Sequence, residues 1–231
     1  MKRSEINKII KDAIALLDKN KFKLPRFAYW SMDEWLENRE NIDLIREVGL
    51  GWDITDFGSG DFDKIGAVLF TIRNGKVGKE GVGSPYAEKI LIFKEGQRLP
   101  IHYHAEKTED IINRAEGVME MRFYKKLADG SVDYNGEIEY YSDGIKYTVK
   151  AGEPVDITTG NSVRLDPFIN HTFGAKLGFG PLICGEVSKI NDDLTDNYFA
   201  EPTARFADIE EDEAPLCPLC NEYEKLVPRK A

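Results

Sequence analysis

The chain has 231 residues, 42% of them hydrophobic and 31% charged, a composition typical of an ordinary soluble globular protein. Its 31 basic and 41 acidic residues give a formal net charge of −10. This argues against a nucleic-acid partner, which would require a basic surface to neutralise phosphates. No apolar run approaches the roughly 20 residues of a membrane span, and charges interrupt the N-terminal apolar residues too often for a signal peptide. We therefore expect a cytoplasmic protein with no membrane partner.

The N-terminal part, residues 1–60, is predicted to contain helices. Apolar residues recur at helical spacing from Ile6 to Leu17, and Ser4 is a candidate N-cap before them. Ser31 is followed three residues later by Glu34, which is the capping-box pattern expected at the start of a second, short helix.

From about Gly66 the pattern changes to short segments that are rich in β-branched and aromatic residues and bounded by turn residues. No run of helices separates them, so an antiparallel sandwich or barrel is favoured over a parallel sheet. We expect one domain, with a barrel over 66–190 and an acidic, aromatic-containing tail over 191–231 that packs on it. The predicted strands are 67–75, 88–96, 117–127, 136–144, 145–153, 155–165 and 181–190.

The stretch LPIHYHAEKTED contains His102 and His104, two of only three histidines in the chain. In a strand, side chains two residues apart point to the same face, so both imidazoles can face the interior of a barrel and bind one metal ion. The alternative interpretation is a pair of partly buried histidines that only pack.

The acidic partner of this pair is left open by spacing alone. Glu106 has the parity of a continuing strand, whereas Glu109 has the opposite parity. The sequence AEKTED is a poor strand former, however, and a turn there would free the parity. Glu106, Glu109 and Asp110 all stay candidates on this reasoning.

The same region resembles the first cupin motif, and DPFINHTFGA resembles the second. The resemblance implies an antiparallel cupin β-barrel (a double-stranded β-helix or jelly roll) with N-terminal helices, and it assigns all three histidines to one metal ion. The second motif lacks its usual glycine, and the first has one extra residue between its glutamate and its last glycine. The positions that carry the match are Gly96, His102, His104, Glu109, Gly117, Pro167 and His171.

Beyond the barrel motifs, the segments GEVSKINDD and FAEPTARFADIEEDE resemble the D-lyxose isomerase family. The resemblance implies interconversion of D-lyxose and D-xylulose, and of D-mannose and D-fructose, by a homodimer with one divalent ion, usually Mn²⁺. An N/O ligand set of this kind also suits Co²⁺, Fe²⁺, Ni²⁺ or Zn²⁺. The residues implied are Lys107 and Glu201 as the acid/base pair, Glu186, Asp192 and Arg205 for sugar hydroxyls, and His102, His104, Glu109 and His171 for the metal.

Such an isomerisation needs a polarised carbonyl and a proton shuttle between neighbouring carbons through an enediol. The enzymatic alternatives are a cupin dioxygenase with the same ligands and a sugar-phosphate isomerase, which should carry a cluster of Lys and Arg. The non-enzymatic alternative is a sugar-binding cupin module. On sequence alone Lys107 could equally be a solvated loop residue.

The chain has three cysteines, an odd number that makes a disulfide framework unfavourable. Cys217 and Cys220 form a CxxC motif that supplies only half of a zinc site. We interpret both as structural thiols; a zinc ion shared across a dimer interface is the alternative.

Overall fold

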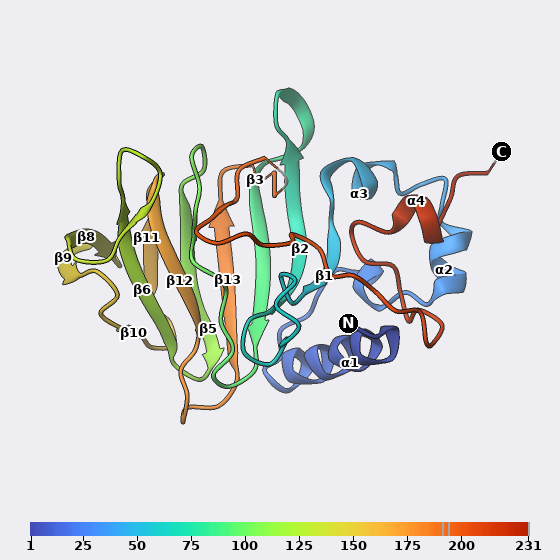
Figure 1. The fold of residues 1–231 in the computed structure, drawn as a ribbon. Helices are drawn as coiled ribbons and strands as arrows, with labels where there is room; N and C mark the ends of the chain where they lie inside the picture. The colour runs from blue at the N-terminus through green and yellow to red at the C-terminus, as the bar shows by residue number, and fades with distance from the viewer. Residues whose placement is uncertain (191, 194, 231) are drawn as a thin grey trace.

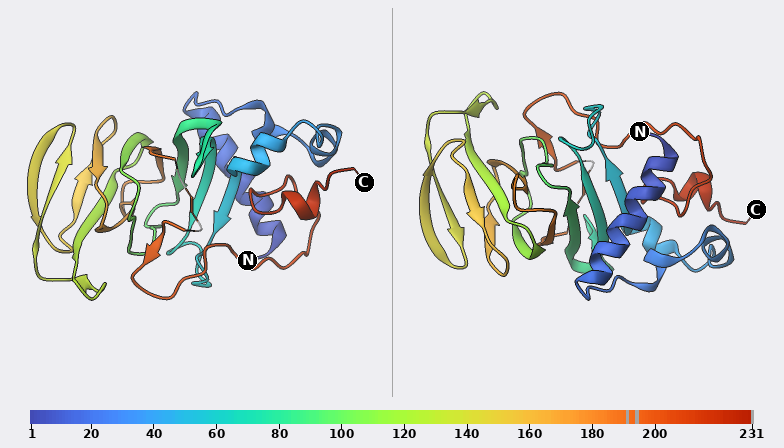
Figure 2. Two further views of the ribbon diagram at one scale, coloured as in Figure 1. Left: turned by 90° about the horizontal axis from the view of Figure 1, so that it is seen from above. Right: turned by 90° about the horizontal axis from the view of Figure 1, so that it is seen from below.

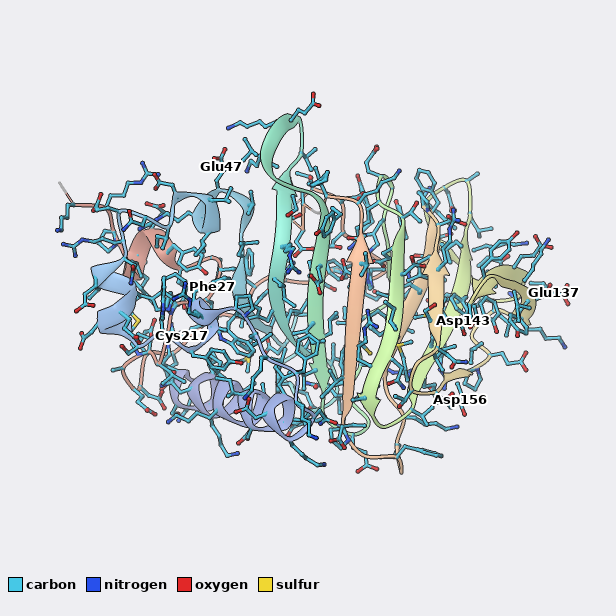
Figure 3. All side chains as sticks on the ribbon, turned by 180° about the vertical axis from the view of Figure 1, so that it is seen from behind. Phe27, Glu47, Glu137, Asp143, Asp156 and Cys217 are labelled. Atoms are coloured by element: carbon cyan, nitrogen blue, oxygen red, sulfur yellow. The ribbon has the colours of Figure 1, made fainter. Side chains whose placement is uncertain are left out.

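Helices cover one face and one end of a curled, mostly antiparallel β structure (Figure 1). The computed structural model describes residues 1–190, 192–193 and 195–230. Viewed from above and below, the molecule is elongated, and α1 runs across the sheet at the end where both termini lie (Figure 2). Side chains such as Phe27 and Cys217 mark this helical end, and Glu137 and Asp143 mark the opposite end (Figure 3).

The elements follow the expected order of helices, strands and an irregular tail. The helical elements are α1 (Arg3–Lys19), η1 (Arg26–Tyr29), α2 (Met32–Glu37), α3 (Asp43–Val48) and α4 (Tyr223–Leu226). The strands are β1 (Gly51–Thr55), β2 (Ala67–Lys76), β3 (Lys79–Phe93), β4 (His102–Tyr103), β5 (Glu109–Glu116), β6 (Met119–Lys126), β7 (Val132–Asp133), β8 (Glu137–Ser142), β9 (Ile145–Lys150), β10 (Val155–Ile157), β11 (Ser162–Leu165), β12 (Ile169–Ala175), β13 (Leu182–Ser188) and β14 (Tyr198–Phe199).

The strands form two antiparallel sheets. The larger sheet has eight strands in the order β1-β2-β3-β13-β5-β11-β8-β9, and the smaller runs β10-β6-β12-β4-β14, with β7 paired to β6. Consecutive strands often lie in different sheets: β4 belongs to the smaller sheet and β5 to the larger. The chain therefore crosses between the two sheets repeatedly, as expected for the predicted cupin barrel, and the predicted fold class is confirmed.

The central strands are buried on both faces, and alternate residues serve two separate cores. On β2, Val68 and Phe70 join the core beneath the helices, whereas Leu69 joins the core inside the barrel. Ile90 and Leu91 on β3 divide in the same way. One face of the large sheet thus holds the helical layer, and the other face forms the interior in which the site lies.

Several local predictions were wrong. Strand β1 lies within the segment expected to be helical. Helix α1 begins at Arg3, with Lys2 as N-cap instead of Ser4. The Arg3 guanidinium is fully buried and pairs with Glu211 and Glu222, so a tertiary contact determines where this helix starts. The Ser31–Glu34 capping box is confirmed.

The tail returns across the molecule. Strand β14 pairs with β4, and residues near Glu222 pack against α1. Asn191 and Ala231, the two ends of the tail segment, lie outside the described residues. Among the helices that the structure describes, none combines the length and apolar character needed to cross a membrane.

Candidate active site

One end of the barrel interior is polar because four strands of the larger sheet, β1, β3, β13 and β5, each place a charged residue there. Asp53, Lys89, Glu109 and Glu186 are all buried, with 3–4% of each residue exposed. Glu186 on β13 lies opposite Lys89 on β3, and Ser188 lies opposite Glu109 on β5. Strand parity alone therefore gathers acidic and basic groups on one inner face.

The three histidines face this polar group from the smaller sheet. His102 on β4 is the direct cross-strand partner of His171 on β12, and His104 follows two residues after His102. All three are buried, and one ring nitrogen from each lies within 4.8 Å of the others. The structure therefore brings together the histidines that the sequence pattern grouped.

Hydrogen bonds determine which nitrogen of each ring carries the proton. Each Nδ1 lies near a backbone carbonyl oxygen: 2.9 Å for His102 to Pro100, 2.6 Å for His104 to Asp196 and 3.0 Å for His171 to Ile169. A carbonyl only accepts, so each Nδ1–H donates and each Nε2 of a neutral ring is left with a lone pair. Burial, together with the two neighbouring histidines, lowers the pKa of His102 well below 6.5, which favours the neutral ring.

Glu109 supplies a fourth acceptor at the same point. Its Oε1 lies 3.3 Å from Nε2 of His104 and 3.4 Å from Nε2 of His171. Two ligand atoms that coordinate one ion at right angles, each about 2.1 Å from it, are about 3 Å apart, which is close to these two distances. The other two candidates, Glu106 and Asp110, are exposed. Because the chain leaves β4 after Tyr103 and starts β5 at Glu109, the alternation of side chains along one strand does not apply across this segment, and Glu109 can face the histidines.

This donor set fits a divalent cation. The Nε2 of His171 is buried and has no hydrogen-bond partner among the described residues. Three lone pairs and a carboxylate oxygen converge, and acceptors that face one another without a proton between them are unfavourable unless a cation lies there. Mixed nitrogen and oxygen donors of this kind suit Mn²⁺ and its first-row neighbours.

Lys107 is also buried, which excludes the solvated-loop interpretation. Its Nζ lies 2.8 Å from Oε2 of Glu109 and 2.9 Å from Oε1 of Glu186. Burial would lower the pKa of Lys107, but the negative charges of Glu109, Glu186 and Asp193 outweigh it and raise the pKa above 10.5. Lys107 is therefore an ammonium donor placed directly beside the four converging acceptors.

The ion pairs continue away from the histidines. Lys89 pairs with Asp193 at 3.1 Å, and Arg205 bridges Asp193 at 2.7 Å and Asp53 at 2.6 Å. A cavity of about 50 Å³ lies along this row. Its polar lining comprises Lys89, His102, His104, Lys107, Glu109, Glu186, Asp193, Asn197 and Arg205, and its apolar lining includes Phe57, Leu99, Phe173 and Phe199.

Two implied residues lie outside this cavity. Glu201 is exposed, on the segment between the lining residues Phe199 and Arg205. Asp192 lines a neighbouring hollow that shares Asp193 and Arg205 with the cavity. The structure thus brings Lys107, Glu186 and Arg205 to the cavity, but it does not bring Glu201 or Asp192 there.

Sequence reasoning missed Lys89, Asp193, Asn197 and Asp196. Lys89 could have been noticed as the one charged residue in the apolar run KILIF, since a buried lysine requires a partner. The three tail residues gave no such signal, because they lie in a segment with many acidic and polar residues.

Comparison with known proteins agrees with this geometry. The family model for D-lyxose isomerase matches residues 1–223. The chain belongs to the D-lyxose isomerase family. It is 38% identical to the D-lyxose/D-mannose isomerase of Serratia proteamaculans over 98% of this chain and 100% of that protein. It is 37% identical to the enzyme of the same description from Escherichia coli O157:H7, over 96% and 98%.

Solved structures show the same fold. L-ribose isomerase of Acinetobacter sp. DL28, in complex with L-ribose, has a TM-score of 0.61 at 16% identity, covering 91% of this chain and 98% of that one. The Geodermatophilus obscurus L-ribose isomerase has a TM-score of 0.56 at 17% identity, with the same coverage. As a member of the D-lyxose isomerase family, the protein is an enzyme, a sugar isomerase.

Proposed function

We propose that this D-lyxose isomerase family member is a metal-dependent aldose–ketose isomerase acting on free sugars. Its first substrate pair is D-lyxose and D-xylulose, and its second is D-mannose and D-fructose. The observation that carries the proposal is the convergence of three imidazole Nε2 atoms and a Glu109 oxygen beside the buried ammonium of Lys107. The catalysed change passes through an enediol by proton transfer.

His102, His104, His171 and Glu109 would hold the divalent ion, with Mn²⁺ as first choice and Co²⁺, Fe²⁺, Ni²⁺ or Zn²⁺ as alternatives. When bound, the ion supplies Lewis-acid polarisation of the sugar carbonyl. The protein contributes the rigid geometry: two of the ligands are cross-strand neighbours, and all four are buried.

Lys107 is proposed as the acid that holds a proton at Nζ for the sugar oxygens. Two carboxylates orient this ammonium, one from Glu109 and one from Glu186. The resemblance implies that Glu186 binds a sugar hydroxyl, but Glu186 already accepts a hydrogen bond from Lys107, so its proposed role is to position Lys107. Without a bound cation, the charges of Glu109, Glu186 and Asp193 raise the pKa of Lys107 and favour its protonated form.

Glu201 is proposed as the base that moves the proton between the two carbons. Its segment connects two cavity-lining residues, Phe199 and Arg205, so a local rearrangement of that segment would bring the carboxylate over the cavity. The apolar wall beneath it, including Phe57 and Phe199, would exclude water from the reacting carbons.

Arg205 and Asp192, together with Lys89, Asp193 and Asn197, are proposed to bind sugar hydroxyls. Lys89, Lys107 and Arg205 are each ion-paired with a carboxylate. Their positive charge is thus balanced by the protein itself, which favours a neutral sugar over the sugar phosphate of the alternative hypothesis. Membership of a sugar isomerase family disfavours the dioxygenase and the non-catalytic module.

The decisive test is turnover of chelator-stripped protein, with and without added Mn²⁺, incubated anaerobically with D-lyxose. D-xylulose formed only with the metal is the expected result. No ketose from D-lyxose or D-mannose with any of the five metals would refute the proposal. The homodimer that the resemblance implies and the cytoplasmic location expected from the sequence belong to the same proposal, and sedimentation velocity would measure the oligomeric state.

A further inference from the structure

The three imidazoles are not held in the same way. His102 and His171 each donate Nδ1–H to the carbonyl two residues earlier in the chain, that of Pro100 and that of Ile169. His104 instead donates to the carbonyl of Asp196, which is 92 positions away in the tail. The orientation of one proposed ligand therefore depends on a segment that is remote in the chain.

The side chain of Asp196 makes a second attachment to the same loop. Its Oδ1 accepts the backbone N–H of Ala105 at 2.7 Å and that of Glu106 at 3.0 Å. Its Oδ2 accepts the N–H of Lys107 at 3.0 Å. Asp196 is 8% exposed. One carboxylate thus satisfies three successive amides of the loop between His104 and Glu109, amides that no strand partner could satisfy at this break between sheets.

The tail residues that follow Asp196 contact strand β4. Tyr198 stacks on Tyr103 with ring centroids 4.8 Å apart and planes 9° apart, and β14 pairs with β4. Next to Asp196, Asn197 lines the cavity, as does Phe199. The residues that hold the ligand loop and those that form the sugar cavity are therefore consecutive in the tail.

We infer that Asp196 is a positioning residue that couples docking of the tail to assembly of the metal site. It aims Nε2 of His104 through its own carbonyl, and its carboxylate fixes the loop that carries Lys107 and Glu109. This rests on the proposed metal dependence. By linkage, a cation that requires the ordered loop also stabilises the docked tail, so metal loading and closure of the sugar cavity occur together.

Asp196→Ala is expected to raise the Kd for Mn²⁺ by about 10- to 100-fold, measured by titration of the stripped protein. Asp196→Asn retains one acceptor oxygen but turns an N–H₂ toward the Lys107 amide, so its Kd should lie between the two. The matched control is Asp133→Ala. Asp133 also accepts two loop amides, from Asn135 and Gly136, but it is the last residue of β7, before the turn to β8, and its loss should leave the Kd within twofold.

Hydrogen exchange of the wild-type protein tests the coupling even if the Ala variant does not fold. Mn²⁺ should slow amide exchange in peptides that cover 104–109 and also in peptides that cover 195–200. Protection of the first segment alone would overturn the coupling, as would a folded Asp196→Ala variant with a wild-type Kd. Wild-type protein that binds no Mn²⁺ would instead overturn the proposed function, and this inference with it.

Discussion

Replacement of Lys107 by methionine separates metal binding from catalysis. Methionine matches the lysine side chain as far as Cε, with sulfur in place of Cδ, and lacks the ammonium, which lies 2.8 Å from Glu109 and 2.9 Å from Glu186. If Lys107 is the acid, kcat/KM should fall by about 10²–10⁴, equivalent to about 2.7–5.5 kcal/mol of transition-state stabilisation. The affinity for Mn²⁺ should hold or rise, since a positive charge that competes for Glu109 has been removed.

The loss of a buried ion-pair partner should also destabilise the metal-free protein, by about 3–5 kcal/mol. The cost of leaving Glu186 without Lys107 is smaller, because Nζ of Lys89 lies 3.7 Å from Oε1 of Glu186 and still balances its charge. Lys89→Met is the matched control: the residue is equally buried but pairs with Asp193, so we expect KM to rise while kcat changes by less than about tenfold. The reasoning is refuted if Mn²⁺-loaded Lys107→Met keeps kcat within about tenfold of wild type, or if it loses activity only because Mn²⁺ no longer binds.

Three further outcomes are expected. Mn²⁺ at 100 times its Kd should add about 2.7 kcal/mol and raise the Tm of stripped protein by about 5–10 °C in calorimetry; an unchanged Tm would count against the four-ligand site. Glu201→Gln should lower kcat by about 10²–10⁴ and leave Tm unchanged, since its side chain is exposed. The control Glu213→Gln, at another exposed residue, should leave both kcat and Tm unchanged. The Arg3 and Lys225 partners of Glu211 lower its pKa from 4.5 to about 2. The stability that Glu211 contributes is therefore complete above pH 4.5 and lost as the pH falls toward 2, so Glu211→Gln should be less stable than wild type at pH 7 and approach it at pH 3 in thermal melts.

The fold was predictable where local pattern and tertiary environment agree. The strands with β-branched and aromatic residues, such as β3 and β13, were found because their residues are typical of strands wherever they occur. Strand β12 was missed, since INHTFGA mixes polar residues with glycine. Strand β1 was missed because it follows a helical segment and its five residues are buried on both faces, so it shows no alternation.

The same distinction applies to the site. Two histidines two residues apart carry a local signal, and the third histidine completes the group across one strand pairing. Glu109 can reach the histidines only because the chain breaks between β4 and β5. The sequence AEKTED suggested such a break but not its exact position. The contributions of Asp193 and Asp196 depend on contacts between residues about 90–100 positions apart, and no short-range pattern encodes these.

The charges of the cavity give a reason for the lysines to lie beside the proposed metal ligands. With neutral histidines, three basic and four acidic side chains give +3 − 4 = −1 in a largely buried row. A net buried charge is costly, and two further positive charges at the histidines would change it to +1. That surplus would complement the single negative charge that the proposed proton transfer places on the sugar oxygens, so the row would stabilise the enediolate more than the neutral sugar. The groups counted are Lys89, Lys107 and Arg205 against Asp53, Glu109, Glu186 and Asp193.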